Sequence, residues 1–173
     1  MVDLLELFLD TNIWLSFYNY SRDDLEELRK LAVLIDNERV KLYVTDQVRY
    51  EFRRNREGKF ADAMKRFNAE GLNDQFPQMC KEYDPDYKAM REAIRGFRDA
   101  KKRLLAKVNE DFEKEALKAD EIIKILFSKA VKINASDEII RKAEVRNLRG
   151  NPPGKKDSIG DAINWECLGA VPK

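Results

Sequence analysis

The sequence predicts an α/β domain that is dominated by helices and contains a short parallel sheet and a long inserted helical hairpin. Residues 4–9 are apolar except for Glu6, as in a strand covered on both faces of a parallel sheet, and residues 40–44 (VKLYV) alternate as a second strand. A helical pattern at residues 21–36 separates these strands, which predicts a βαβ unit. Residues 87–130 contain no proline and carry apolar side chains at three- and four-residue steps, which predicts two helices in an antiparallel hairpin.

The length of 173 residues predicts a single domain over residues 1–173, with the hairpin inserted at about residues 75–133. The absence of histidine excludes serine or cysteine triads and histidine-ligated zinc. The two cysteines are far apart and lack C-x-x-C spacing, which favours a reducing, cytoplasmic setting. No signal peptide or membrane-length apolar run is present, so no membrane partner is expected.

Helix-start signals divide the rest of the chain. Ser21 is expected to cap the helix at residues 21–36, and Thr45 or Asp46 to cap one that begins near Gln47. Further helices are expected from about Ser136 to Arg146 and from Asp157 onward.

The first candidate for chemistry is Asp10, which follows the first strand directly together with Thr11 and Asn12. Open parallel sheets bind ligands just beyond the carboxyl ends of their strands. The alternative is that Asp10 or Asn12 only caps the next helix.

The second candidate is Glu51, which falls beside the apolar pair Val48 and Phe52 on the helix after the second strand. A carboxylate on the apolar side of a helix is costly unless a cation, a metal or a donor meets it. The alternative is that Glu51 only balances the arginines of the same helix, at positions 49, 53, 54 and 56.

The third candidate is Asp161, one turn into the last helix and on the same stripe as Trp165 and Leu168. Asp157 lies four residues earlier on that face, but Asp157 or Ser158 is also a good N-cap.

The three main candidates, Asp10, Glu51 and Asp161, could meet at one edge of the sheet. Two carboxylates about 4 Å apart repel by about 4 kcal/mol at an effective dielectric near 20, so such a cluster requires a cation. Ligands that are all oxygens favour Mg²⁺ or Mn²⁺, and a phosphodiester is the substrate that this site implies.

Basic residues are segregated along the chain, because residues 88–107 hold eight of them and residues 110–121 hold six acidic ones. Most such runs are solvated helix faces, and contact with phosphates is the functional alternative. The candidate nucleic-acid-binding residues are Arg49, Arg53, Arg54, Lys101, Lys102, Arg103, Lys155 and Lys156.

Three ordered motifs, FLDTNIWL, VTDQVRYEF and NPPGKKDSIGDAINWECL, resemble those of PIN-domain nucleases, compact α/β/α domains that cleave RNA, and less often DNA, with a divalent metal. By this resemblance Asp10, Glu51 and Asp161 match the metal-binding acids, Asp157 is an accessory acid, and Thr11 and Asn12 orient the first acid. The resemblance implies a Mg²⁺- or Mn²⁺-dependent endoribonuclease, with RNA rather than DNA as the expected substrate.

One departure concerns the end of the chain. The family continues after the last motif with a strand that carries a fourth acid, whereas this sequence ends at Lys173, so we expect a C-terminally incomplete domain whose own activity is in doubt. One alternative function is a catalytically silent PIN-like scaffold that binds a protein, RNA or a second copy through its hairpin. Another is a phosphotransferase of the haloacid-dehalogenase type, but Asn12 stands where that chemistry requires a second aspartate.

Overall fold

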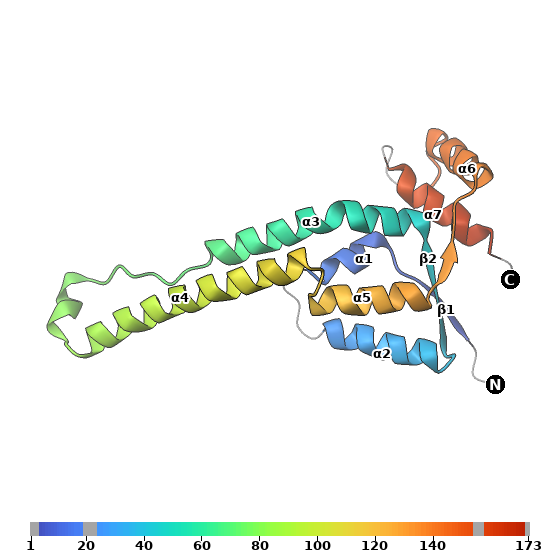
Figure 1. The fold of residues 1–173 in the computed structure, drawn as a ribbon. Helices are drawn as coiled ribbons and strands as arrows, with labels where there is room; N and C mark the ends of the chain where they lie inside the picture. Colours follow the sequence, from blue (N-terminus) through green and yellow to red (C-terminus); the bar gives the residue numbers. More distant parts are fainter. Residues whose placement is uncertain (1–3, 19–23, 154–157, 172–173) are drawn as a thin grey trace.

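The computed structural model describes residues 4–18, 24–153 and 158–171, and it confirms the helix-dominated α/β fold (Figure 1). Its parallel sheet has the order β1-β2-β3, with β1 at Leu5–Phe8, β2 at Val40–Thr45 and β3 at Val131–Ile133. Leu7 pairs in register with Leu42, and Val44 with Lys132. The sequence did not predict β3, because three residues are too few to show alternation.

The prediction that the first strand is covered on both faces is wrong for its beginning. Leu4 and Leu5 are 49% and 59% exposed, whereas Leu42 and Val44 on β2 are almost completely buried. The reason is the strand order, because β1 lies at an edge of the sheet and β2 lies in the centre. The described residues form three strands, so the expectation of an incomplete domain stays a prediction.

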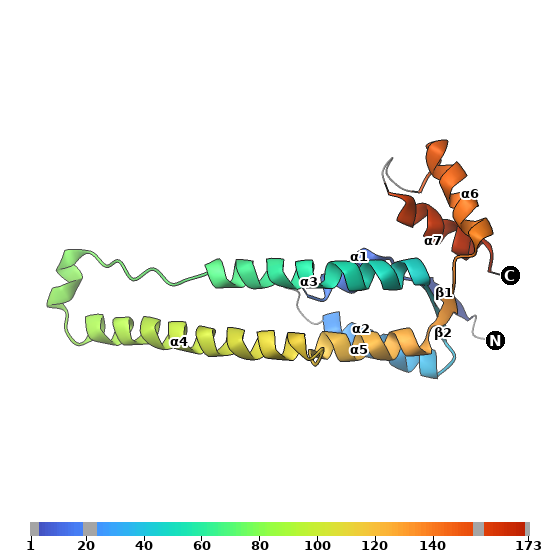
Figure 2. The same ribbon diagram turned by 45° about the horizontal axis from the view of Figure 1, so that its top comes forward.

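Helices lie on both sides of the sheet (Figures 1 and 2). On one side are α1 (Thr11–Ser16), α2 (Asp24–Asp36) and α5 (Lys118–Lys129), and on the other are α6 (Asp137–Leu148) and α7 (Ile159–Gly169). The predicted cap of α3 is confirmed, because Thr45 Oγ1 accepts from the backbone N–H of Val48. Ser136, the expected start of a further helix, is the N-cap of α6, and its Oγ accepts from the backbone N–H of Ile139. The predicted cap Ser21 lies outside the described residues.

Between β2 and α5 the chain forms a long arm (Figure 2). Helix α3 (Asp46–Ala69) runs away from the sheet, a short 3₁₀ helix, η1 (Gln78–Glu82), lies near the tip, and α4 (Asp86–Glu113) returns antiparallel to α3. The two helices predicted within residues 87–130 are present as α4 and α5, but α5 continues in the direction of α4. The antiparallel partner of α4 is therefore α3, and the predicted pairing was wrong because the turn between α4 and α5 does not reverse the chain.

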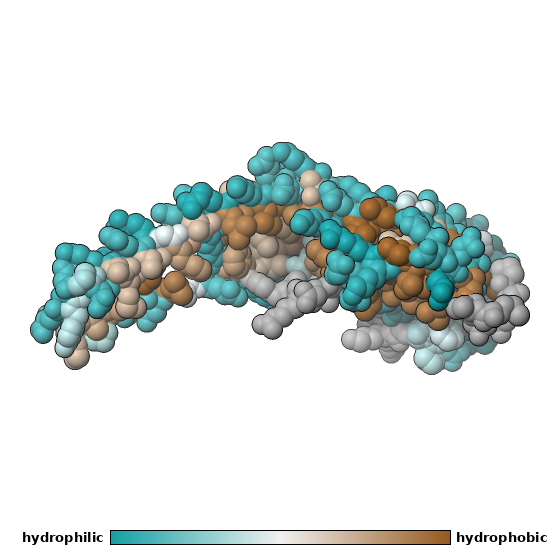
Figure 3. Space-filling model, turned by 90° about the horizontal axis from the view of Figure 1, so that it is seen from below, coloured by the Kyte–Doolittle hydropathy of each residue, from teal (hydrophilic) through white to brown (hydrophobic). Residues whose placement is uncertain are grey.

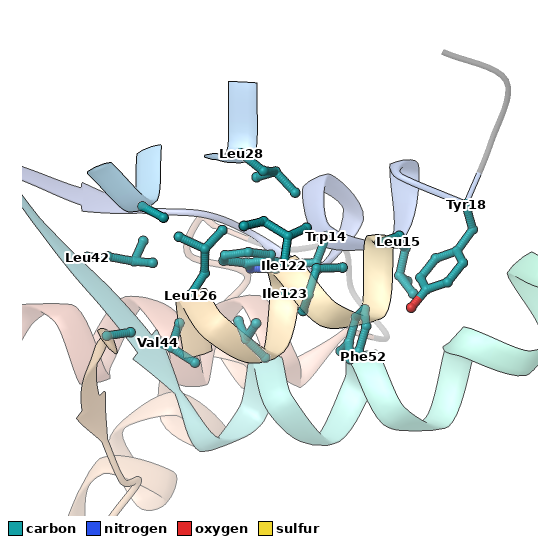
Figure 4. Packing of buried hydrophobic residues seen from close by; sticks show 14 of the residues in the cluster. Trp14, Leu15, Tyr18, Leu28, Leu42, Val44, Phe52, Ile122, Ile123 and Leu126 are labelled. Atoms are coloured by element: carbon teal, nitrogen blue, oxygen red, sulfur yellow. The ribbon is translucent and has the colours of Figure 1, made fainter. Parts of the chain in front are cut away.

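The main core joins the sheet to α1, α2, α3 and α5 (Figure 4). Trp14, Ile123 and Leu126 are almost completely buried there, and Trp14 meets Phe127 edge to face at 4.8 Å between ring centroids. At the base of the arm Phe60 of α3 stacks on Phe112 of α4 at 3.7 Å. Burial of these side chains fixes where α3 leaves the sheet, and with it the position of Glu51.

A buried ion pair closes the same core. Arg56 of α3 contacts both carboxylate oxygens of Asp120 on α5, at 2.8 Å from Nε and 2.6 Å from Nη2, and the Tyr18 hydroxyl donates to the same carboxylate. Burial acts to lower the pKa of Arg56, but its bonds to Asp120 and Tyr18 outweigh burial and raise that pKa. The Arg56 side chain is therefore a structural part of the core.

No helix within the described residues is long and apolar enough to cross a membrane.

Candidate functional site

The first part of the candidate site lies at the carboxyl end of β1. Asp10 is the N-cap residue of α1, with extended backbone angles, but its side chain makes no capping hydrogen bond. Instead Asp10 Oδ2 accepts from Asn12 Nδ2 at 3.1 Å. The capping alternative for the Asp10 side chain therefore does not hold, and this carboxylate instead contacts the Asn12 amide.

The second part is Glu51, half-buried on the second turn of α3. Thr11 Oγ1 donates to Glu51 Oε2 at 2.8 Å, and Gln47 Nε2 donates to Glu51 Oε1 at 2.7 Å. Thr11 was expected to orient Asp10, but the first residue of α1 faces α3 and so its hydroxyl meets the second acid instead. Both donors are neutral, and Arg56, one of the arginines that could have balanced Glu51, pairs with Asp120.

The third part is the first turn of α7, which lies directly against Glu51. A Cβ built at Gly160 would lie 2.2 Å from Glu51 Oε1 and 2.9 Å from Gln47 Nε2, closer than real Cβ contacts. Only glycine therefore allows this approach without moving the carboxylate. Asp161, the next residue, is half-buried.

These contacts bring together three segments that are far apart in the sequence. Asp10 precedes Thr11, Thr11 bonds to Glu51, Glu51 packs against Gly160, and Gly160 precedes Asp161. The carboxyl ends of β1 and β2 and the amino end of α7 thus meet at one edge of the sheet, as expected for a parallel α/β fold.

Asn164 and Thr45 link α7 to the end of β2, and no pattern in the sequence indicates a functional role for Asn164. Thr45 Oγ1 donates to Asn164 Oδ1 at 2.6 Å while it accepts from Val48 N at 3.1 Å. Both side chains are buried, and the Asn164 amide nitrogen has no hydrogen-bond partner among the described residues. The pair fixes the start of α3 relative to α7, and therefore Glu51 relative to Asp161.

Sequence reasoning also does not select Gln47 and Gly160 as residues of the candidate site. For Gln47 the signal was its i,i+4 spacing to Glu51, which puts a neutral donor beside the carboxylate on one helix face. A glycine inside the GDA motif was the only sign of a close helix approach.

The chemistry of the available ligands fits a hard cation. Histidine is absent, and burial together with the nearby Asp46 raises the pKa of the Cys167 thiol to about 11, so it stays protonated at neutral pH. Carboxylates remain, and these favour Mg²⁺ or Mn²⁺ over softer metals. Within the described residues, however, no group of three acidic, cysteine or histidine side chains is arranged to hold an ion. Asp157 lies outside those residues.

The candidate nucleic-acid-binding residues lie in two places. On α3, Arg49 is half-buried while Arg53 and Arg54 are exposed, and the Arg54 guanidinium lies 5.4 Å from the centre of the Tyr50 ring. On the arm, Lys101 donates to the backbone carbonyls of Asn68 and Glu70 and so closes the end of α3. The remaining candidates on the arm are Lys102 and Arg103, while Lys155 and Lys156 lie outside the described residues.

Comparison with protein-family models shows a match to the family described as "PIN domain" over residues 7–171. This range includes all three acids and the whole arm. Comparison with curated proteins and with solved structures gives no match.

Proposed function

Because the chain belongs to the PIN-domain family, we propose that it is a metal-dependent endoribonuclease in which Asp10, Glu51 and Asp161 hold one divalent cation. PIN domains are generally nucleases, act on nucleic acids and use divalent metals. The observation that carries the proposal for this chain is the linked contact of Thr11, Glu51 and Gly160, which brings three acid-bearing segments to one edge of the sheet.

The polar neighbours of the acids act on their geometry. Asn12 holds Asp10, and Thr11 and Gln47 each occupy one lone pair on one oxygen of Glu51, which leaves a further lone pair on each oxygen for a ligand. Mg²⁺ or Mn²⁺ bound there supplies polarisation of the phosphoryl oxygen and a lowered pKa of attacking water. Asp157 is an accessory acid in this proposal.

Phosphate binding is assigned first to Arg53 and Arg54, which are exposed on α3 just beyond Glu51. Arg49 lies on the same helix one turn before Arg53. Lys155 and Lys156, which precede α7 in the sequence, are further candidates for phosphate contact in this proposal. Lys102 and Arg103 on the arm reach more distant phosphates of a longer RNA, and we expect Lys101 to contribute less because its ammonium already binds the end of α3.

The test compares the wild type with Asp10→Asn, which keeps the shape of the side chain but removes its charge. Labelled single-stranded RNA and DNA are incubated with Mn²⁺, Mg²⁺ or a chelator. We expect cleavage of RNA by the wild type only with metal, and loss of cleavage in Asp10→Asn while RNA binding and the thermal midpoint stay unchanged. Glu57→Gln, an exposed acid on the same helix as Glu51, is the matched control and should keep full activity. Undiminished cleavage by Asp10→Asn would overturn the assignment.

A second candidate function is a binding module without catalysis. One observation favours it: apolar side chains gather along one side of the arm (Figure 3), and Met90, Phe97 and Leu104 of α4 are exposed. A protein partner or a second copy of the chain would cover this face. Tight binding of such a partner by a protein that shows no metal-stimulated cleavage would favour this function over the first.

A further inference from the structure

We propose that Trp165 and Arg146 form a subsite on which a nucleotide base of single-stranded RNA stacks beside the acids. The inference rests on the proposed function, because it adds a base-binding surface to the same site. The two tryptophans of the chain differ sharply in environment: Trp14 is completely buried in the core, whereas Trp165 on α7 is 53% exposed.

The position of Trp165 relative to Asp161 suits a strand that passes the acids. Four residues of α-helix advance by about 6 Å and return to nearly the same face, so the exposed Trp165 follows the half-buried Asp161 along one side of α7. The neighbouring face of α7 is occupied, since Gly160 meets Glu51, Asn164 bonds to Thr45 and Cys167 is buried. A base next to a phosphate at the proposed cation site, of which Asp161 would be one ligand, is therefore within reach of the indole ring.

Arg146 of α6 completes the surface. Its guanidinium lies over the Trp165 ring at 5.7 Å from the ring centre. It is fixed there by two bonds, from Nε to Glu166 Oε1 and from Nη1 to the carbonyl oxygen of Pro152, each 2.7 Å long. A held guanidinium beside an exposed aromatic ring is a combination that binds nucleotides, since the ring stacks on the base and the cation attracts the phosphate.

The charge of the adjoining surface favours an anion over an apolar protein partner. A hollow of about 370 Å³ lies beside Arg146, and its lining includes Arg141, Lys142 and Arg149 against two acids, Glu138 and Glu166. The positive charge continues from Arg146 into this hollow, so the ring can take a base while the cations of the hollow take the backbone.

The test measures binding without cleavage, in the presence of a chelator. Short single-stranded RNA is titrated into the intact protein while tryptophan fluorescence is recorded. We expect quenching of Trp165, and its loss in Trp165→Phe, which leaves only the buried Trp14. Trp165→Ala should weaken binding by about tenfold, whereas Trp165→Phe keeps a stacking ring and should lose much less. Leu148→Ala, at an exposed apolar residue of α6, is the matched control and should bind like the wild type.

An abasic strand of the same length separates stacking from a structural role. The wild type should bind it more weakly than RNA, and Trp165→Ala should bind the two strands alike. Absence of quenching, equal binding by Trp165→Ala and the wild type, or an effect of Trp165→Ala on oligomeric state alone would overturn the subsite. Because no cleavage is measured, these results are independent of the Asp10→Asn test: the subsite can fail while the acids prove catalytic, and the reverse.

Discussion

Replacement of Gly160 by alanine tests whether the approach of α7 to Glu51 matters for activity. The added Cβ would lie 2.2 Å from Glu51 Oε1, and ordinary contact begins near 3.4 Å, so the carboxylate must retreat by about 1 Å. That movement disturbs the hydrogen bonds from Thr11 and Gln47, at a cost of about 1 kcal/mol each. Alanine regains part of this loss, because it is favoured over glycine in a helix by about 1 kcal/mol.

We therefore expect Gly160→Ala to lower stability by about 1 kcal/mol but to lower the cleavage rate by about 100-fold, since a misplacement of 1 Å at a reacting centre has effects of that size. The assay is single-turnover cleavage of labelled RNA with Mn²⁺, alongside urea unfolding. Gly58→Ala is the control, because nothing lies within 4 Å of a Cβ at this position on α3. Gly160→Ala should also add little to the loss already caused by Glu51→Gln, because both act on one carboxylate. Full activity of Gly160→Ala, or a fully additive loss in the double variant, would refute the reasoning.

Three further predictions concern stability and are measured by urea unfolding. Thr45→Val removes the cap of α3 and the partner of Asn164, so it should cost about 2 kcal/mol, while Thr45→Ser keeps both bonds and should cost much less; equal losses in the two would contradict this role. Asp120→Ala leaves the Arg56 guanidinium buried without its partner and should cost about 3 kcal/mol, whereas Asp74→Ala, in the exposed pair with Arg98, should cost much less. The buried thiol of Cys167 has a pKa of about 11 against an ordinary 9.0, so its stabilising contribution is complete below pH 9 and is lost as the pH rises through 11. Cys167→Ala should therefore lose less stability than the wild type between these pH values. Burial and Asp120 also raise the pKa of Tyr18, so the stability of both proteins falls further with rising pH for that reason. Identical pH profiles of stability for the two proteins would contradict the role of Cys167.

The sequence predicted the parts of the fold whose signals are local. Strand β2 alternates clearly, Thr45 is a good cap, and the spacing of Val48, Glu51 and Phe52 placed the carboxylate beside the core. The length of α3 was not predictable in the same way, because beyond Phe52 charged residues surround the helix on most sides and no apolar stripe marks its continuation. For that reason the sequence predicts both helices of the hairpin within residues 87–130, and it does not indicate that α3 forms the first half of the arm.

The candidate site shows the same division. Asp10, Glu51 and Asp161 could each be selected from strand ends and helix faces. The residues that join these acids could not be selected from the sequence. The role of Gly160 depends on Glu51 Oε1, which would lie 2.2 Å from a Cβ at Gly160, and the role of Asn164 depends on its hydrogen bond with Thr45. Such contacts depend on how separate elements pack, and a single sequence does not encode that packing in any local pattern.

The central claim is that Asp10, Glu51 and Asp161 share one divalent ion. The most direct measurement is calorimetric titration of Mn²⁺ into the wild type, Asp10→Asn, Glu51→Gln, Asp161→Asn and the control Glu57→Gln. One site is expected in the wild type and the control, with affinity reduced at least about tenfold by each of the other three substitutions. Unaltered Mn²⁺ affinity in those three variants, or no binding by the wild type, would contradict the claim.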